Sequence, residues 1–187
     1  MHRVTYQMGM SADGYIVDAD GASTGRSRAP ISSASTSRSL GSIAVHLMGR
    51  RLYETMTYWE DPANAASFDA AEREWADLWN ALPKLVFSRT LTEVTGAATL
   101  ATEDLATEIA RLKSLPGDGD LAIGGADLAH QIAALDLIDE YQVLVNPAVA
   151  GGGVPYFAHD GRHERLTLVE HRAFDGGTVL LRYRVER

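Results

Sequence analysis

The chain contains no cysteine among its 187 residues and no apolar run of about 18 residues. The first absence excludes a disulfide framework, a thiolate zinc site and a cysteine nucleophile. The second argues against a transmembrane helix, and the first ten residues lack the apolar stretch of a signal peptide. We therefore expect a cytoplasmic protein with no membrane partner.

Basic charge is also scarce, because 17 lysines and arginines stand against 25 acids, which gives a net charge of −8. Proteins that bind nucleic acid or an anionic membrane need clustered basic charge, so neither partner is expected. His159 and His163 are four residues apart, but a predicted turn at Asp160-Gly161 separates them. We expect no metal site. The pattern GxGxxG is absent too, which argues against a standard Rossmann site.

What is present is an alternation of predicted strands and helices that closes in a hairpin. Strands are expected at 3–10, 42–49, 84–88, 121–123 and 140–149, helices at 50–56, 69–82, 102–115 and after residue 125, and the hairpin at 165–174 and 178–186. This order predicts an α/β fold with a mostly parallel sheet and an antiparallel C-terminal hairpin. Length and composition fit a single domain over residues 1–187.

Two of the predicted helices carry start signals. In 69–82, Asp69 can cap the first turn with Glu72 three residues on. In 102–115, Thr102 stands at the start, ahead of acids in the first turn. The apolar stripe expected for the first of these helices consists of Trp75, Leu78, Trp79 and Leu82.

One segment, residues 22–42, departs from the pattern. Eight of its 21 residues are serine and three are arginine, and no acid occurs between Asp20 and Glu54. Such a composition is typical of a flexible surface loop. A locally shifted reading frame is the alternative, since G+C-rich DNA read out of frame often yields sequences rich in serine, arginine, alanine and proline.

The stretch LAIGGADL, residues 121–128, joins a strand to a helix through Gly124 and Gly125. A helix that begins at the carboxyl end of a strand presents free N–H groups and a dipole that favour an anion. Glycine lets the backbone approach a phosphate closely. Tight-turn chemistry is the other explanation for the same two residues.

Two further strand ends carry cationic or hydroxyl groups. Arg50 and Arg51 open the helix that follows Gly49, where their charge opposes the helix dipole unless an anion binds. Ser88 and Arg89 follow the strand at 84–88. Ligands of open α/β sheets bind at this edge, so a ligand with several phosphates would use all three strand ends. The alternative is that the arginines are solvated surface residues.

Taken together, these motifs resemble the reductase domain of bifunctional riboflavin-biosynthesis deaminase-reductases, a branch of the dihydrofolate-reductase-like fold. The likeness is greater still to stand-alone, single-domain bacterial members. The matching pieces, in family order, are SADGYI (11–16), LMGRRLYETM (47–56), PKLVFSRTL (83–91), AIGGADL (122–128), LIDEYQVLVNPAVAGGGVPYF (137–157) and the closing hairpin.

The resemblance implies a three-layer α/β/α domain that binds NADPH and reduces a small-molecule substrate, pterin- or ribosylaminopyrimidine-like, usually as a homodimer. Its implied cofactor-binding residues are Ser11, Gly14, Gly49, Arg50, Arg51, Ser88, Arg89, Gly124, Gly125, Ala126, Gly151 and Gly152. Asp13, in the loop over the nicotinamide, is the candidate proton donor. A turn-forming Asp-Gly is the other interpretation of this residue.

Residues 22–42 depart from the family, which usually has an aromatic residue and an acid-rich helix there, lining the substrate pocket. Folate reduction is therefore not the expected activity. One alternative function is an NADP(H)-binding protein without turnover. Another is an interaction module that uses the tryptophan-bearing helix.

Overall fold

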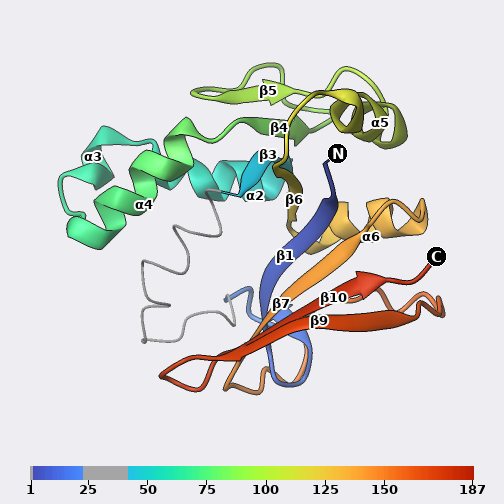
Figure 1. The fold of residues 1–187 in the computed structure, drawn as a ribbon. Coiled ribbons are helices and arrows are strands. Elements are labelled where there is room, and N and C mark those ends of the chain that lie inside the picture. The colour runs from blue at the N-terminus through green and yellow to red at the C-terminus, as the bar shows by residue number, and fades with distance from the viewer. Residues whose placement is uncertain (1, 23–41) are drawn as a thin grey trace. The chain divides into compact units, whose positions relative to one another are not determined.

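The structure, a computed structural model, describes residues 2–22 and 42–187 (Figure 1). Most of the serine-rich segment, residues 23–41, lies outside the described residues, so neither explanation of it is tested. The described chain divides into two compact units. Unit 1 holds residues 2–3 and 42–124, and unit 2 holds residues 4–22 and 125–187.

Unit 1 contains four parallel strands, β3 (Ile43–Gly49), β4 (Lys84–Phe87), β5 (Ala98–Leu100) and β6 (Asp120–Gly124). They are ordered β5-β4-β3-β6, and every neighbouring pair is parallel. All five residues of β6 are buried, as expected of a parallel strand covered on both faces. β5 was not predicted, because three residues are too few to show a strand period.

The helices of unit 1 are α2 (Arg50–Met56), the 3-10 turn η1 (Thr57–Trp59), α3 (Pro62–Ala65), α4 (Ala70–Ala81) and α5 (Leu105–Ser114). The capping box of α4 is confirmed, since Asp69 accepts from the Glu72 amide and Glu72 accepts from the Asp69 amide. The predicted start of α5 was wrong by two residues. Asp104, not Thr102, caps α5, by accepting from the Thr107 amide at 2.9 Å.

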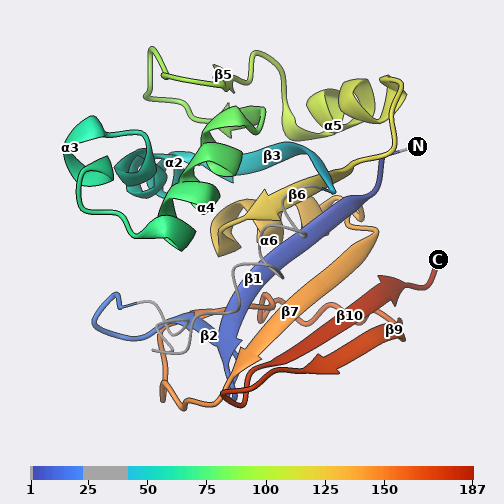
Figure 2. The same ribbon diagram turned by 60° about the vertical axis from the view of Figure 1, so that its left-hand side comes forward.

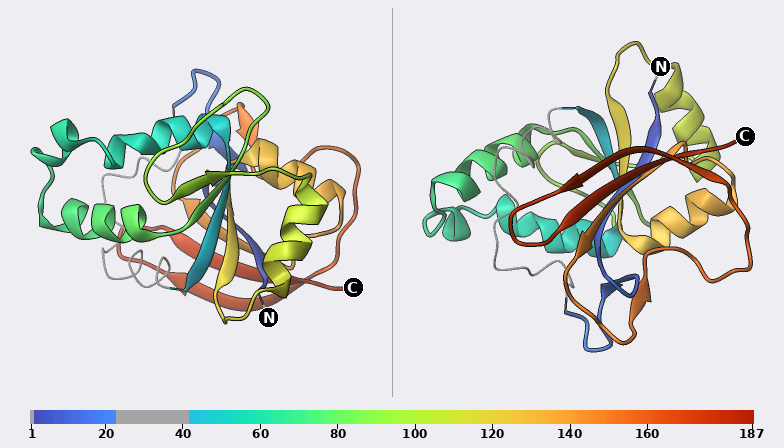
Figure 3. Two further views of the ribbon diagram at one scale, coloured as in Figure 1. Left: turned by 90° about the horizontal axis from the view of Figure 1, so that it is seen from above. Right: turned by 60° about the horizontal axis from the view of Figure 1, so that its bottom comes forward.

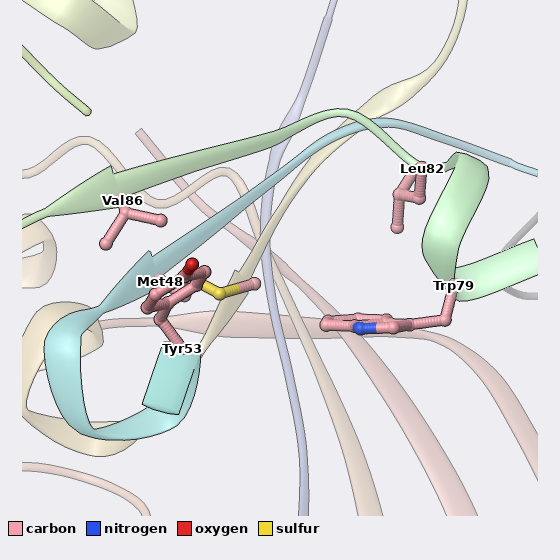
Figure 4. Close-up of a cluster of buried hydrophobic side chains, with 5 residues drawn as sticks. All are labelled: Met48, Tyr53, Trp79, Leu82 and Val86. Carbon is pink, nitrogen blue, oxygen red and sulfur yellow. The ribbon is translucent and has the colours of Figure 1, made fainter. Parts of the chain in front are cut away.

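The core of unit 1 forms where α2 and α4 meet the strands (Figure 4). Its buried side chains are Met48, Tyr53, Trp79, Leu82 and Val86. Leu78 was wrongly included in the buried stripe of α4, because 37% of it is exposed, whereas Ala76 is buried. The Trp79 ring stacks on Trp75 with centroids 5.3 Å apart, so both tryptophans of this helix take part in packing within the unit.

Unit 2 contains β1 (Val4–Ser11), β7 (Glu140–Asn146), β10 (Val179–Val185) and β9 (Leu166–Ala173), ordered β1-β7-β10-β9. β1 and β7 are parallel, and β10 is antiparallel to both of its neighbours (Figure 3). A second ribbon pairs β2 (Tyr15–Val17) with β8 (Val154–Pro155), and α6 spans Ala126–Ala134. β2 and β8 are also too short for a sequence pattern.

The core of unit 2 is built on three tyrosines. The Tyr6 and Tyr156 rings stack with centroids 4.3 Å apart, and the Tyr156 hydroxyl donates to the Tyr6 carbonyl oxygen at 3.0 Å. Tyr141 meets Tyr6 edge to face at 6.4 Å. His130 of α6 hydrogen-bonds through Nε2 to the Tyr156 carbonyl oxygen at 3.0 Å, which ties the helix to the chain that follows β8.

The predicted α/β class, with mostly parallel strands and an antiparallel C-terminal hairpin, is confirmed. That residues 1–187 form a single domain stays a prediction. No helix of the described residues is long and apolar enough to cross a bilayer.

A buried lysine fastens α4 to β4. The Lys84 side chain is 1% exposed, and its Nζ donates to the carbonyl oxygens of Trp79 at 2.7 Å and Leu82 at 3.1 Å. Nζ also lies 3.7 Å from the Glu60 carboxylate and 4.9 Å from the centroid of the Trp79 ring. The lysine thus gives the carbonyl groups at the end of α4 a charged donor.

We expect Lys84→Met to lower the free energy of unfolding by about 2–4 kcal/mol, because the substitution leaves the Glu60 carboxylate and two carbonyl groups without their cation. Urea unfolding measures the change. Lys113→Met, at the chain's other lysine, is the matched control and should change stability by about 0.5 kcal/mol or less. Equal losses in the two variants would contradict the fastening role.

Candidate functional site

In unit 1 three parallel strands end at one edge. Gly49 of β3 lies opposite Phe87 of β4, and Met48 lies opposite Gly124 of β6. The turns that follow these strands therefore emerge side by side. The predicted alignment of three strand ends is found within this unit.

The first turn joins β3 to α2. Gly49 is the N-cap of α2, with φ −83° and no side-chain cap, and a Cβ placed there would meet no atom within 4 Å. Arg50 is exposed, but its Nε donates to Glu54 at 2.7 Å and its Nη1 donates to the Thr90 hydroxyl at 2.9 Å. Arg50 therefore has protein partners that account for its position without a bound anion. Arg51 is exposed on the same helix.

The second turn follows β4. The Ser88 hydroxyl oxygen accepts from the Leu91 amide at 3.0 Å and the Thr90 amide at 3.2 Å, so Ser88 shapes the turn. Arg89 is exposed, and its guanidinium has no hydrogen-bond or ion-pair partner among residues 2–22 and 42–187. Of the predicted phosphate-binding arginines, Arg89 is thus the one whose charge the described chain leaves uncompensated.

Two different constraints account for the adjacent glycines after β6. A Cβ on Gly124 would lie 2.5 Å from Leu52 Cδ2 and 2.6 Å from His46 Cε1, so any other residue there would have to displace one of these side chains. Gly125, the N-cap of α6, has φ +89°, which a residue with a Cβ rarely adopts. Tight packing and turn chemistry explain both residues. The N-terminus of α6 nevertheless carries no side-chain cap.

In unit 2 the turns after β1 and β7 are tied together. Ser11 is fully buried, and its hydroxyl oxygen accepts from the Tyr15 amide at 3.0 Å. The Asp13 carboxylate accepts from the amides of Ala150 at 2.9 Å and Gly151 at 2.7 Å. Ser11 thus acts inside the turn, and Asp13 acts between the two turns.

The same contacts determine the protonation of Asp13. Hydrogen bonds from the Ser11 side chain and from the amides of Ala150 and Gly151 lower the pKa of Asp13 to about 2. The carboxyl is therefore ionised at neutral pH. These contacts give Asp13 a structural role in the two turns, and its role as proton donor stays a prediction.

The glycine loop after β7 is open at two positions and crowded at the third. Gly151 and Gly152 have φ +74° and +153°, and a Cβ on either would meet no atom within 4 Å. A Cβ on Gly153 would lie 2.0 Å from the Val17 carbonyl oxygen, because β2 passes directly over it. Gly14 also has a positive φ, +92°, and open space around it.

His46 was missed as a residue of this edge. Its ring lies beside Gly124 and meets the Trp79 ring at 5.2 Å, and its Nδ1 is shielded from solvent without a partner among the described residues. Burial, with the nearby charge of Lys84, lowers the pKa of His46 to about 4. A polar residue inside the apolar run of β3 was the signal in the sequence that could have identified it.

No group of three histidine or acidic residues in the described chain could hold a metal ion.

We expect Gly124→Ser to destabilise the protein by about 1–3 kcal/mol, since the new side chain must displace Leu52 or His46. Gly49→Ser is the matched control, because that site is open and serine is favoured at an N-cap. Thermal unfolding of both variants makes the comparison. A stable Gly124→Ser variant would show that the packing can relax around this turn.

We expect acid to weaken the fold through His46. Its pKa is about 4 in the folded chain and about 6.5 when unfolded, so the unfolded state takes up the proton first as pH falls. This contribution is complete above pH 6.5 and is lost toward pH 4, with a loss of about 2 kcal/mol by pH 5. Urea unfolding at pH 7 and pH 5 measures this loss of unfolding free energy. His46→Leu should make the difference between the two pH values smaller, and His163→Gln, the control, should leave that difference unchanged.

Comparison with known proteins places the chain in a family. The RibD C-terminal domain family matches residues 2–180. YyaP of Bacillus subtilis is 30% identical over 148 residues, which cover 77% of this chain and 75% of that protein.

Solved structures share the fold at low sequence identity. A protein of Shewanella sp. PV-4 named for riboflavin biosynthesis superimposes with a TM-score of 0.77 at 21% identity, over 100% of both chains. Dihydrofolate reductase from Enterococcus faecalis, in complex with NADP(H), gives a TM-score of 0.64 at 11% identity, over 99% of this chain and 97% of that one. The chain belongs to the RibD C-terminal domain family and has a dihydrofolate-reductase-like fold.

Proposed function

We propose that the protein is an NADPH-dependent reductase that passes a hydride to a C=N or C=O group of a small heterocyclic substrate, pterin-like or ribosylaminopyrimidine-like. Family membership supports a reductase. The NADP(H) held by the E. faecalis dihydrofolate reductase, and the phosphoribosylaminouracil reductase activity named for a Thermotoga maritima protein of the same fold, support the cofactor and the substrate class.

The observation that carries the proposal is the uncompensated Arg89 at the carboxyl end of β4. A guanidinium presents paired N–H groups that match the oxygens of a phosphate. Ser88 precedes it and adds a hydroxyl whose oxygen is held in the turn. We assign this pair to the ribose 2′-phosphate, the group that distinguishes NADPH from NADH.

Other predicted residues fit the remaining phosphates. At Gly49 the backbone is open to close approach, and the α2 N-terminus there has no side-chain cap. The N-terminus of α6 at Gly125 is likewise uncapped. Free N–H groups at such ends attract anionic groups. We assign Gly49 with Arg51, and Gly124 through Ala126, to phosphate contacts, and Arg50 to bracing the two turns of unit 1.

In unit 2 we assign Gly14, Gly151 and Gly152 to backbone contact with the nicotinamide half of the cofactor. The Asp13 carboxylate holds the loop at residues 150–151 in place, and Ser11 holds the turn that carries Asp13. Bound NADPH would supply the hydride. The protein's part would be to bind, to orient and to keep these turns rigid.

We expect NADPH to quench the fluorescence of Trp59, Trp75 and Trp79 at a lower concentration than NADH does. Arg89→Gln should raise the NADPH dissociation constant by about 10–100-fold and leave NADH binding unchanged, because only NADPH carries the 2′-phosphate. Arg73→Gln, at an exposed arginine of α4, is the matched control. Equal binding of the two cofactors by the native protein, or equal effects of the two variants, would contradict the assignment.

A turnover assay distinguishes a reductase from a protein that only binds NADP(H). NADPH oxidation at 340 nm would be followed with a panel of pterins, ribosylaminopyrimidines and imines. Oxidation with any of them supports a reductase. Tight NADPH binding without oxidation across the panel favours the alternative, an NADP(H)-binding protein without turnover.

A further inference from the structure

Two glutamines lie side by side on one face of the strands of unit 2. These strands are ordered β1-β7-β10-β9 (Figure 2), and Gln7 of β1 is paired with Gln142 of β7. Residues that are paired across neighbouring strands point to the same face of a sheet. The two side-chain amides therefore leave the sheet next to each other, from backbones roughly 4.8 Å apart.

The glutamine pair lies on the face opposite α6. Tyr6 and Tyr141, which precede the two glutamines in their strands, line a small cavity together with Ala129 of α6. Because side chains alternate between the two faces along a strand, Gln7 and Gln142 point away from this helix. Both glutamines are half-buried.

Neither side-chain amide has a hydrogen-bond partner in the part of the chain that the structure describes. The charged residues beside them are paired, since Arg182 Nε donates to the buried Glu140 at 2.7 Å and Arg182 Nη1 lies 3.5 Å from Glu170. A glutamine amide has two N–H donors and one C=O acceptor. Half-buried amides that make no contact within the fold are available to a ligand.

The glutamine pair lies close to the turns that we assign to the nicotinamide half of the cofactor. β1 and β7 are parallel and end at Ser11 and Asn146, directly before these turns. Gln7 is four residues before Ser11, roughly 13 Å along an extended strand. Gly9 and Leu144 lie between, on the same face, and have no hydrogen-bonding side chain. A flat ring against these two residues would reach the amides at one end and the turns at the other.

We propose that Gln7 and Gln142 recognise the substrate by binding the edge of a heterocycle at which a ring N–H stands beside a ring C=O. The amide oxygen accepts from the ring N–H and the amide N–H donates to the ring C=O, as in the pairing of glutamine with a nucleobase edge. Pterin-like and ribosylaminopyrimidine-like rings both carry this edge. The inference rests on the proposed function for the class of ligand, and it adds the residues that recognise the ring.

Such a pair makes specificity depend on hydrogen bonding and not only on size. An apolar pocket distinguishes ligands of similar shape poorly. A site that hydrogen-bonds a ring N–H rejects the same ring without that group, because its own amides are then left unpaired. The substrate is therefore recognised at the end of the ring that lies away from the turns.

Equilibrium dialysis with pteridine-2,4-dione tests the pair, because this ring carries the N–H and C=O edge. The native protein should bind it. Gln7→Met or Gln142→Met should raise the dissociation constant by about tenfold, since methionine keeps the length of the side chain and lacks the amide. Gln131→Met, at the exposed glutamine of α6, is the matched control and should have no effect. No binding by the native protein, or Gln7 and Gln142 variants that bind as the native protein does, overturns the proposal.

A methylated ring tests the contact itself. 3-Methylpteridine-2,4-dione lacks the ring N–H and should bind the native protein about tenfold or more weakly. This preference should be smaller in each single variant and absent in the double variant, and a preference that persists in the double variant overturns the contact. Melting curves check that every variant folds.

The two proposals can fail separately, because dialysis is done without cofactor. NADPH binding, followed by tryptophan quenching, should be unchanged in the Gln7 and Gln142 variants. A native protein that binds the ring through these amides but does not bind NADPH would support the glutamine contact and contradict the proposed reductase. A native protein that binds NADPH but not the ring would overturn the glutamine contact alone.

Discussion

Parallel pairing within unit 1 is the constraint on which its candidate site depends. Strands that run the same way cannot be joined by a two-residue turn, so the chain must leave each strand at its carboxyl end and return by a longer connection. β3, β4 and β6 are held in a register that ends them together. The turns with chemically useful residues are therefore neighbours, although they are up to 75 residues apart along the chain, from Gly49 to Gly124.

At these strand ends, polar groups divide into those with partners and those without. Arg50 is paired with Glu54 and Thr90, Ser88 supports its own turn, and Asp13 accepts two amide hydrogen bonds. Such groups give rigidity, because their hydrogen bonds are already made. Arg89 differs, since its charge has no counterpart in the described chain. A rigid scaffold with one uncompensated cation is suited to recognising an anionic group.

The two units end their strand arrays in different ways. In unit 1 the outer strand β5 is only three residues long, which limits the free edge it presents. In unit 2 the outer strand β9 has eight residues and is exposed along almost its whole length. A short edge strand is a common protection against unwanted pairing, and a long exposed one is a template for pairing.

The sequence by itself determined the features that recur locally. The alternation of strands and helices, the bounds of α2, the capping box of α4 and the closing hairpin could all be predicted, because period, capping and turn residues act over a few neighbours. The family motifs likewise located the strand ends. Only the tertiary structure decided the rest. Lys84 and His46 are shielded because α4 folds back over β3 and β4. A side chain at Gly124 would collide with His46 and Leu52, and the Asp13 carboxylate is held in place because a loop more than 130 residues away donates to it. These are contacts between distant segments, and no local pattern encodes them.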